Sequence, residues 1–362
     1  MKVLWITSHA DTLNSIRPEA ETLIGLAKRG LDCEIMTQGD SVYRGAMEAA
    51  GVRVIDFVPR GKFGRRDTAF IRRHLVQGRH DILHLFNNKA IATGVRAARG
   101  LPVKVISYRG QTGNVHRYDP TCWLTHLHPR IDRVICVADA VREDMAKHRL
   151  DPDGCVTVYK GHDLTWYADP PADLQALFAI PPAAFVVGAV ANYRPRKGLE
   201  NLIEAALDLP RDAAIHFLLV GRGTDHPRLA NLLAASPFRE RFHFLGFRKD
   251  ACSLIAACDC SVLPSTRREG LPKTVIEAMA YGICPVVTDT GGSAELIVNG
   301  ESGLVVPPGD ADALAKAILQ LYENPADARR MGARARQRIE DKFNIRQTID
   351  KTLEVYRRAL AN

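Results

Sequence analysis

The sequence predicts an α/β protein with two domains in series, each built on a parallel β-sheet with helices on both faces. Its 362 residues exceed what one ordinary hydrophobic core organises. Short apolar stretches alternate with helical patterns in both halves, which is typical of parallel strands joined by crossover helices. Four prolines interrupt this alternation within residues 163–185. We therefore expect domains at residues 1–165 and 166–345, followed by a helix at 346–362.

The first half begins with an apolar, β-branched strand. A polar loop is expected at 10–19, and then a helix at 20–30 that ends at Gly30, a residue that commonly terminates helices. The strands expected in this half are residues 2–8, 32–37, 52–58, 81–86, 104–108 and 133–138.

The second half restarts the same alternation after the proline-rich stretch. A helix is expected at 198–209, and the chain from residue 312 onward reads as helical almost throughout. The strands expected here are residues 185–191, 215–221, 242–246, 260–265 and 284–289. In such sheets ligands bind beyond the carboxyl ends of the strands, which is where the polar motifs of this chain lie.

Composition excludes several classes of protein. With 46% hydrophobic and 25% charged residues, the chain has the make-up of a globular protein. No apolar run reaches the roughly 18 residues of a membrane-spanning helix, and the N-terminus lacks the features of a signal peptide, so we expect a cytoplasmic protein. The eight cysteines lack the paired spacing of a zinc site or a disulfide framework, and we expect buried free thiols.

Positive charge is concentrated in the first half. Residues 1–165 carry 25 Lys and Arg against 18 Asp and Glu, whereas residues 166–362 carry 24 against 23. Much of the excess lies between Arg60 and Arg79, where basic residues alternate with Phe63, Phe70 and Ile71. Such a segment suits an anionic membrane surface, or else forms a solvated amphipathic helix with Phe70 in the core. No nucleic-acid-binding module is recognisable, so nucleic acid is not expected as a partner.

The stretch at residues 268–282 places one carboxylate on a Gly/Pro loop and a second one in a helix. Gly270 allows close approach of a ligand to the backbone, and the amides that open the following helix favour an anion such as phosphate. Glu269 and Glu277 could then hold two parts of one ligand across a diphosphate. The alternative is that Glu269 is a solvated loop charge and Glu277 a surface helix residue.

A second group of polar residues follows the strand at 185–191. Arg194, Arg196 and Lys197 precede a glycine at a helix start, a pattern that suits a diphosphate and stabilises charge on a leaving group. An exposed basic loop is the alternative. The Gly-rich turns at 218–223 and 291–296 are weak signals when taken alone.

Together these motifs resemble the family-4 retaining glycosyltransferases of GT-B fold. The resemblance rests on the order of VANYRPRKG, LLVGRG, FLGFRKDACSLIAACDCSVLPS, EGLPKTVIEAMAYGICPVVTDTGGSAELI and NGESGLVVPPGDADALAKAI. It is strong over residues 185–345 and weaker but collinear over 1–165. It implies two Rossmann-like domains facing a cleft, an N-terminal one for the acceptor and a C-terminal one for the nucleotide-sugar, with the helix at 346–362 crossing back to the first.

The resemblance also implies roles for individual residues. Glu277 would bind the ribose, Glu269 the sugar hydroxyls, and Lys197 the diphosphate. The backbone from Gly270 through Leu271, Pro272 and Lys273 to Thr274 would present amides to the sugar and diphosphate. The nucleobase would lie against Phe247 and Arg248, with Gly221 and Arg222 close by. Transfer would retain the anomeric configuration and use neither a metal ion nor a cofactor.

The chain departs from the family pattern at three places. Asn192 stands where the family usually has an arginine, and either Arg194 or Arg196 could supply that charge. Arg109 stands where many members have a histidine, and His116 follows seven residues later. Both are candidate catalytic residues, although an ion pair with a nearby aspartate would equally explain Arg109. The first loop carries the residues Asn14, Ser15 and Arg17 instead of the usual Gly-Gly, and these would shape the acceptor side.

The function expected from the resemblance is transfer of a hexose-type sugar from a UDP- or GDP-sugar to a glycan or lipid-linked acceptor. Cell-surface polysaccharide or lipopolysaccharide synthesis is the expected setting, with the enzyme peripheral on the inner face of the membrane. A non-catalytic sugar-nucleotide-binding protein and a GT-B epimerase remain alternatives, although the two glutamates argue against the epimerase. This chain lacks the lysine context of a pyridoxal-phosphate-dependent phosphorylase. It also lacks the GxGxxG motif that a nicotinamide dehydrogenase would need after the first strand.

Overall fold

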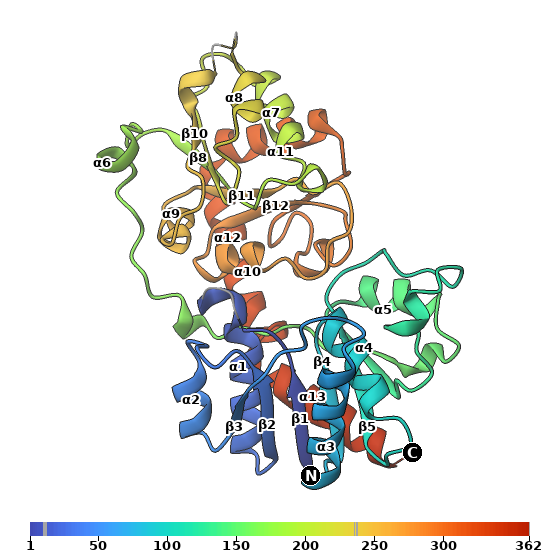
Figure 1. Ribbon diagram of the computed structural model, residues 1–362. Coiled ribbons are helices and arrows are strands. Elements are labelled where there is room, and N and C mark those ends of the chain that lie inside the picture. Colours follow the sequence, from blue (N-terminus) through green and yellow to red (C-terminus); the bar gives the residue numbers. More distant parts are fainter. Residues whose placement is uncertain (10–12, 235, 237, 362) are drawn as a thin grey trace. The chain divides into compact units, whose positions relative to one another are not determined.

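The computed structural model describes residues 1–9, 13–234, 236 and 238–361, and for residues 13–15 it describes the backbone alone. The chain divides into two compact units (Figure 1). Unit 1 contains Met1–Gly161 together with Phe343–Asn362, and unit 2 contains His162–Lys342. The predicted class, two α/β domains with parallel sheets, is confirmed.

Unit 1 is built on a parallel sheet that has seven strands in the described part of the chain. Its strand order is β3-β2-β1-β4-β5-β6-β7, so the order reverses between β1 and β4. This reversal is the topological switch point at which open α/β sheets bind ligands. The strands are β1 (Lys2–Ile6), β2 (Asp32–Thr37), β3 (Arg53–Asp56), β4 (Ile82–Leu85), β5 (Lys104–Arg109), β6 (Arg133–Cys136) and β7 (Cys155–Thr157).

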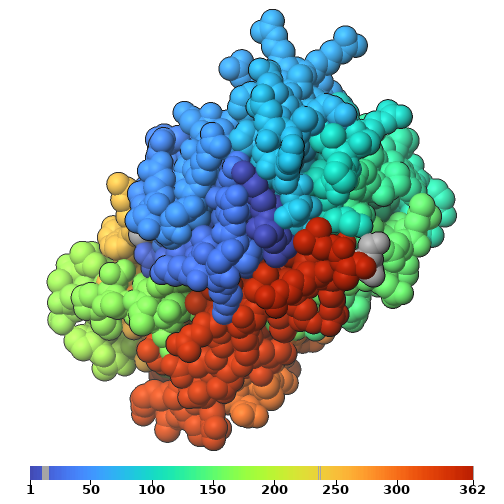
Figure 2. Space-filling view, turned by 90° about the horizontal axis from the view of Figure 1, so that it is seen from below, coloured from blue at the N-terminus to red at the C-terminus, as the bar shows by residue number. Residues whose placement is uncertain are grey.

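The C-terminal helix of the chain belongs to unit 1, as the family resemblance implies. It packs against α1, where Gly25 leaves room for the side chain of Ile349. Figure 2 shows this red segment beside the dark-blue N-terminal part of the chain. The helices of unit 1 are α1 (Leu13–Lys28), α2 (Arg44–Ala49), α3 (Arg65–Gly78), α4 (Asn88–Ala97), α5 (Asp139–Ala146) and α13 (Ile345–Ala361).

A buried hydrogen-bond network ties α13 to the sheet of unit 1. The hydroxyl of Tyr356 accepts a hydrogen bond from Trp5 Nε1 at 2.8 Å and lies 2.7 Å from His84 Nδ1. Both partners sit on neighbouring strands, β1 and β4. Burial lowers the pKa of His84 to about 3, so the ring is neutral in the folded protein.

Unit 2 repeats the architecture with the order β10-β9-β8-β11-β12-β13, which reverses between β8 and β11. Its strands are β8 (Phe185–Val190), β9 (Ile215–Val220), β10 (Phe242–Phe244), β11 (Cys260–Leu263), β12 (Cys284–Thr288) and β13 (Leu304–Val306). Its helices are α6 (Leu174–Phe178), α7 (Leu199–Leu207), α8 (Pro227–Asn231), α9 (Ala251–Ala256), α10 (Lys273–Ala280), α11 (Ala311–Glu323) and α12 (Pro325–Lys342).

The continuous apolar run of β8 is explained by burial on both faces of the sheet. Phe185, Val187 and Ala189 belong to the core on one face, whereas Val186 and Val190 belong to or pack against the core on the other. Alternate residues of a strand point to opposite faces, so a strand covered by helices on both sides must be apolar throughout.

The expected loop at residues 10–19 is wrong over most of its length, because α1 begins at Leu13. Ile16, Ala20 and Leu23 are all buried and continue one apolar stripe at helical spacing, which outweighs the helix-breaking tendency of Pro18. The short strands β7 and β13 were missed.

Two expectations drawn from composition can be compared with the structure. All eight cysteines are buried and free, as predicted. Among the residues that the structure describes, no helix is both long and apolar enough to cross a membrane.

Candidate functional site

The candidate site of unit 2 lies at the carboxyl ends of β8 and β11, the two strands that flank the reversal of strand order. The segment after β8 carries Lys197, and the segment after β11 carries Glu269. Lys197 Nζ lies 2.7 Å from Glu269 Oε1, so two residues 72 positions apart in the sequence meet there. The switch point is where this fold class binds ligands.

Glu269 is buried, with 5% of its surface exposed, and several groups hold its carboxylate in place. Ser265 Oγ donates a hydrogen bond to Oε1 at 2.6 Å, and Arg196 Nη1 lies 3.6 Å from the same oxygen. Thr288 in turn donates from Oγ1 to the carbonyl of Ser265 at 2.5 Å. The carboxylate is therefore fixed before any ligand arrives, which favours precise recognition of hydroxyl groups.

Two glycines permit the close backbone approach on which this arrangement depends. Gly198 has φ +65°, and a Cβ there would lie 2.0 Å from the carbonyl oxygen of Pro264. Gly291 has φ +53°, and a Cβ there would lie 2.2 Å from the carbonyl oxygen of Glu269. The Gly-rich turn at 291–296, a weak signal in the sequence, thus packs directly on the loop that carries Glu269.

Glu277 is also buried, at 7% exposure, although it lies on the helix α10. Its Oε1 is 3.5 Å from Lys273 Nζ, one turn earlier. The reading of Glu277 as a surface residue is therefore wrong, and so is the reading of Glu269 as a solvated charge. Burial of carboxylates is costly unless they have partners, which makes both of them candidates for ligand contacts.

The loop between Glu269 and α10 has the form expected for a backbone anion site. Gly270 and Pro272 are buried, and Leu271 and Thr274 are half-buried. Pro272 precedes the first helical residue, Lys273, and the opening amides of α10 make no side-chain cap hydrogen bond. Free amides at a helix start attract negative charge.

The carboxyl ends of β9 and β10 form the neighbouring part of the edge. Gly221 has φ +143° and a Cβ there would lie 2.2 Å from the carbonyl oxygen of Ala191. The Gly221 amide donates to the carbonyl of Gly246 at 2.8 Å. Phe247 is 48% exposed, and the guanidinium of Arg222 lies 5.2 Å from its ring centre. Arg248 forms an ion pair with Asp250 at 2.6 Å.

The structure distinguishes between the two arginines that follow Asn192. Arg196 approaches Glu269 and also donates to the carbonyl of Arg268 at 3.0 Å, whereas Arg194 is exposed. Asn192 Oδ1 accepts a hydrogen bond from the amide of Arg222 at 2.9 Å, so it braces the loop after β9. The positive charge beside Lys197 thus comes from Arg196.

In unit 1, Arg109 stands at the end of β5 and is buried at 7% exposure. Its guanidinium donates to the carbonyl of Gly113 and lies 3.4 Å from His126 Nε2. Burial lowers the pKa of Arg109 below its usual value. His126 also contacts Asn88, and burial with the neighbouring charge of Arg109 lowers the pKa of His126 to about 3. Arg109 is therefore a buried residue whose guanidinium is held by Gly113 and His126, and it is not a surface residue.

The other expected residues of unit 1 lie elsewhere. His116 is exposed, and its ring meets that of His148 edge-on with the ring centres 5.5 Å apart. Within the described part of the chain, no hydrogen bond or ion pair joins His116 to Arg109. Arg17 is half-buried and donates from Nε to the hydroxyl of Tyr43 at 3.0 Å. The side chains of Asn14 and Ser15 lie outside the described residues.

Sequence reasoning missed a half-buried charged group beside the carboxyl end of β1. Glu19 lies 3.0 Å from Lys160 Nζ and 3.7 Å from His9 Nε2, and it accepts from Thr7 Oγ1 at 3.1 Å. Burial alone would raise the pKa of Glu19, but Lys160 and His9 lower it to about 2. Glu19 and Lys160 are 141 positions apart, so no local pattern could have revealed the pair.

Two family models match the chain. The model described as "Glycosyl transferases group 1" covers residues 175–338, and "Glycosyltransferase Family 4" covers residues 20–166. The two matches together span most of the chain and agree with the two units of the fold. The chain belongs to glycosyltransferase family 4 and has the GT-B fold.

Solved structures of similar fold cover the whole chain. A glycosyltransferase from Rickettsia africae ESF-5 superposes with a TM-score of 0.85 at 20% identity, covering 100% of this chain and 99% of the other. Anabaena Alr3699/HepE, solved in complex with UDP, gives a TM-score of 0.79 at 21% identity, covering 99% and 100%. At these low sequence identities, the structural similarity shows a shared fold alone.

Curated relatives match over shorter stretches. N-acetyl-alpha-D-glucosaminyl L-malate synthase of Bacillus anthracis is 26% identical over 55% of this chain and 50% of its own length. The lipopolysaccharide core biosynthesis mannosyltransferase LpcC of Rhizobium leguminosarum bv. viciae is 28% identical over 78% of this chain and 80% of its own. The chain thus spans half the length of the first of these relatives.

Proposed function

We propose that this protein is a retaining, metal-independent glycosyltransferase. It moves a hexose-type sugar from a UDP- or GDP-sugar to a glycan or lipid-linked acceptor, in the synthesis of cell-surface polysaccharide or lipopolysaccharide. The observation that carries this proposal is the convergence of Lys197 and Arg196 on buried Glu269 at the switch point of unit 2. The role that the name of LpcC gives, lipopolysaccharide core biosynthesis, supports the proposed pathway. The UDP bound in the Alr3699/HepE structure supports a nucleotide-sugar donor.

The donor is held along the carboxyl edge of unit 2. Glu277 accepts hydrogen bonds from the ribose, and the opening amides of α10 bind the diphosphate. Phe247, which is 48% exposed, offers an aromatic face beside the nucleobase. Glu269 accepts hydrogen bonds from hydroxyls of the transferred sugar. Lys197 then exchanges its contact with Glu269 for the diphosphate, as the donor brings a stronger negative charge.

Transfer breaks the bond between the anomeric carbon and the diphosphate oxygen, and it forms a bond from that carbon to the acceptor oxygen on the same face. The proton of the acceptor hydroxyl passes to the departing phosphate oxygen. Negative charge grows on the diphosphate during this step, and Lys197 and Arg196 stabilise it. These fixed cations and the helix amides do the work that a metal ion does in other transferases, so we expect none to be required.

The acceptor is proposed to bind unit 1 near the carboxyl end of β5. Arg109 is the candidate there for a contact with a phosphate or an acidic group of the acceptor. Arg17, Asn14 and Ser15 are proposed to shape the acceptor side as well. His116 is a candidate for this site only if its exposed loop rearranges. Arg109 is held by Gly113 and His126, so its position is set without a ligand.

The experiment that tests the proposed function is a screen of the purified chain with UDP-, GDP-, ADP- and dTDP-sugars. Each is tested with a chelator and with magnesium, by thermal shift and by release of the nucleoside diphosphate. We expect one nucleotide to raise the melting temperature and to be slowly hydrolysed in the chelator. Binding without release, even with acceptor present, would favour a non-catalytic sugar-nucleotide-binding protein. No binding at all would overturn the donor site.

We also propose that unit 1 docks on an anionic membrane surface through the segment between Arg60 and Arg79, on the inner face of the membrane. Phe63 and Val76 are 57% and 53% exposed, while Ile71 is buried. Phe70 is half-buried and stacks on Phe57, so its ring is less available to a membrane than those of the exposed residues. Exposed basic residues flank these apolar side chains: Arg60, Lys62, Arg65, Arg66, Arg72, Arg73 and Arg79. Light-blue side chains of this part project outward in Figure 2.

Vesicle sedimentation tests the membrane proposal. The chain is expected to pellet with vesicles that contain anionic lipid and to stay in solution with neutral ones, and high salt should release it. The double variant R65E/R66E should lose this binding while its melting temperature stays unchanged, because both residues are exposed. Equal binding of the variant would contradict the assignment of this surface.

A further inference from the structure

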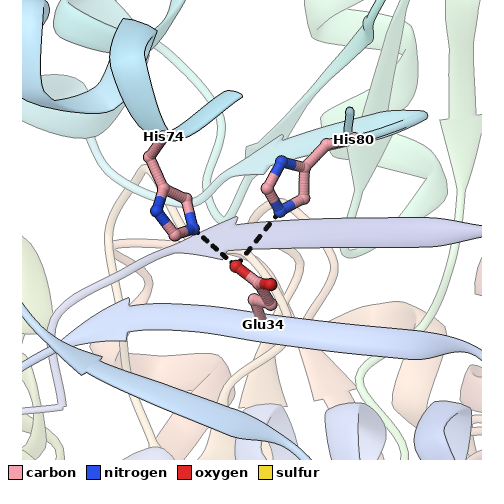
Figure 3. Close-up of side chains that lie close together, drawn as sticks. All are labelled: Glu34, His74 and His80. Atoms are coloured by element: carbon pink, nitrogen blue, oxygen red, sulfur yellow. Dashed lines mark hydrogen bonds and ion pairs between the residues drawn. The ribbon is translucent and has the colours of Figure 1, made fainter. Parts of the chain in front are cut away.

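We propose that Glu34, His74 and His80 form a binding site for a transition-metal dication of the zinc class. The three residues offer one nitrogen or oxygen each, and these atoms all lie within 4.8 Å of one another. His74 Nε2 is 2.5 Å and His80 Nε2 is 3.2 Å from the same carboxylate oxygen, Glu34 Oε2. Figure 3 shows both rings on the same side of Glu34, with a nitrogen of each directed at that oxygen.

Part of the geometry matches that of a loaded site. Metal–ligand bonds of about 2.0–2.1 Å in a tetrahedral zinc site put neighbouring ligand atoms about 3.4 Å apart. His80 Nε2 already has this separation from Oε2, and His74 Nε2 must move outward by roughly 1 Å. The side chain of His74 is 18% exposed and lies near the end of α3, so its ring has room for that movement.

Burial and close packing hold two of the three ligand side chains in place. Glu34 lies on β2 and is buried at 2% exposure, so its carboxylate is held in one place. His80 follows α3 and is also buried, and Gly78 makes room for its ring because a Cβ there would lie 2.2 Å from His80 Cε1. Two imidazoles and one carboxylate are a ligand set that suits zinc and its neighbours in the transition series.

Two cations beside the carboxylate set a limit on the affinity. Lys2 Nζ is 2.9 Å and Arg53 Nη1 3.7 Å from the other oxygen, Oε1, which leaves Oε2 for the metal. Asp32 lies 3.5 Å from Lys2 and offsets part of its charge, and the side chain of Arg53 is 69% exposed and able to turn away. We therefore expect weaker binding than in a closed four-ligand zinc site.

The site stands apart from the proposed catalytic machinery. Glu34 and Lys2 lie toward the amino ends of β2 and β1, and His80 precedes β4, whereas sugar nucleotides bind at carboxyl ends. Its effect would be structural, because the ion would tie the end of α3 to the sheet. Three protein ligands leave the fourth position to water.

The test uses untagged full-length protein, stripped with a chelator and titrated with Zn²⁺ alone by calorimetry, and separately with Co²⁺ by visible absorption. We expect one ion to bind per chain, a tetrahedral Co²⁺ spectrum and a rise in melting temperature with Zn²⁺. The variant His74→Ala should weaken Zn²⁺ binding by more than the roughly 10–100-fold that loss of an outer partner costs. It keeps its fold because His74 is partly exposed.

His148→Ala is the matched control, since His148 is a half-buried histidine of the same unit. It should leave Zn²⁺ binding and the Co²⁺ spectrum unchanged. The proposal is overturned if no saturable binding occurs, or if His74→Ala and His148→Ala bind alike. Glu34, His74 and His80 would then be a hydrogen-bonded cluster and nothing more. The readouts do not depend on transferase activity, so failure here leaves the proposed function intact.

Discussion

Lys197 is the residue whose contacts say most about the chemistry of this chain. It is held 2.7 Å from Glu269 in a setting where only 17% of its side chain is exposed. A cation that already has a carboxylate partner gains most from a ligand whose negative charge exceeds that partner's. That condition is met by a diphosphate, and above all by a diphosphate that is leaving.

Replacement of Lys197 by alanine is therefore expected to lower kcat more than it raises the Kd for the donor. Single-turnover kinetics and calorimetry on the same preparation measure the two effects. Because the change removes one of the cations beside the buried carboxylate of Glu269, the melting temperature must be measured as well. Equal losses in kcat and in donor affinity would contradict a role in the transition state.

At the scale of elements, the loops around the site depend on glycines with positive φ. Gly198→Ala and Gly291→Ala each place a Cβ about 2 Å from a backbone carbonyl oxygen. We expect each to cost more than the roughly 1–3 kcal/mol of backbone strain alone, measured by urea unfolding. Gly300→Ala is the control, since it has φ +77° with no atom within 4 Å. A loss as large in the control would show that φ, and not close packing, is the cause.

The helix α13 depends on one hydroxyl for its polar contact with the sheet. Tyr356→Phe removes it and leaves Trp5 Nε1 and His84 Nδ1 buried without their partner. Each unsatisfied buried group costs about 1–3 kcal/mol, so urea unfolding should show a loss of at least that size. Tyr118→Phe, at a residue that is 98% exposed, should change nothing. A neutral Tyr356→Phe would mean that water replaces the hydroxyl.

Strands and helices of this protein were largely predictable, and contacts between distant segments were not. The run at 32–37 gave β2 with its observed bounds, because β-branched and apolar residues stand between clear turn signals. The start of α1 was misplaced because polar residues hide the stripe through Ile16. Local spacing placed Lys197 and Glu269 on separate loops, and their contact follows only from the strand order. The pair Glu19–Lys160 and the cluster of Glu34, His74 and His80 had no signal in one sequence.

For the whole molecule, two buried histidines are expected to set the response to acid. Burial lowers the pKa of His84 and of His126 to about 3, so both bind protons more tightly in the unfolded chain. Stability is then fully present above the unfolded pKa of about 6.5 and falls as pH drops toward 3. Each histidine contributes a slope of about 1.4 kcal/mol per pH unit well below 6.5.

Urea unfolding between pH 7 and pH 5 measures this slope. The variant His126→Gln should reduce it, because glutamine does not titrate. Stability that is flat over this range in the unmodified protein would contradict the neutral, buried state of the two rings.

The central claim is that unit 2 binds a nucleotide-sugar through its two buried glutamates. Calorimetric titration of the active UDP- or GDP-sugar into the wild-type chain and into Glu277→Ala tests it most directly. The account predicts a loss of about 1.5–3 kcal/mol in binding free energy, the size of a charged hydrogen bond. The exposed Glu204→Ala should bind as the wild type does. Unchanged donor affinity in Glu277→Ala would contradict the assignment of the ribose contact and, with it, the proposed donor site.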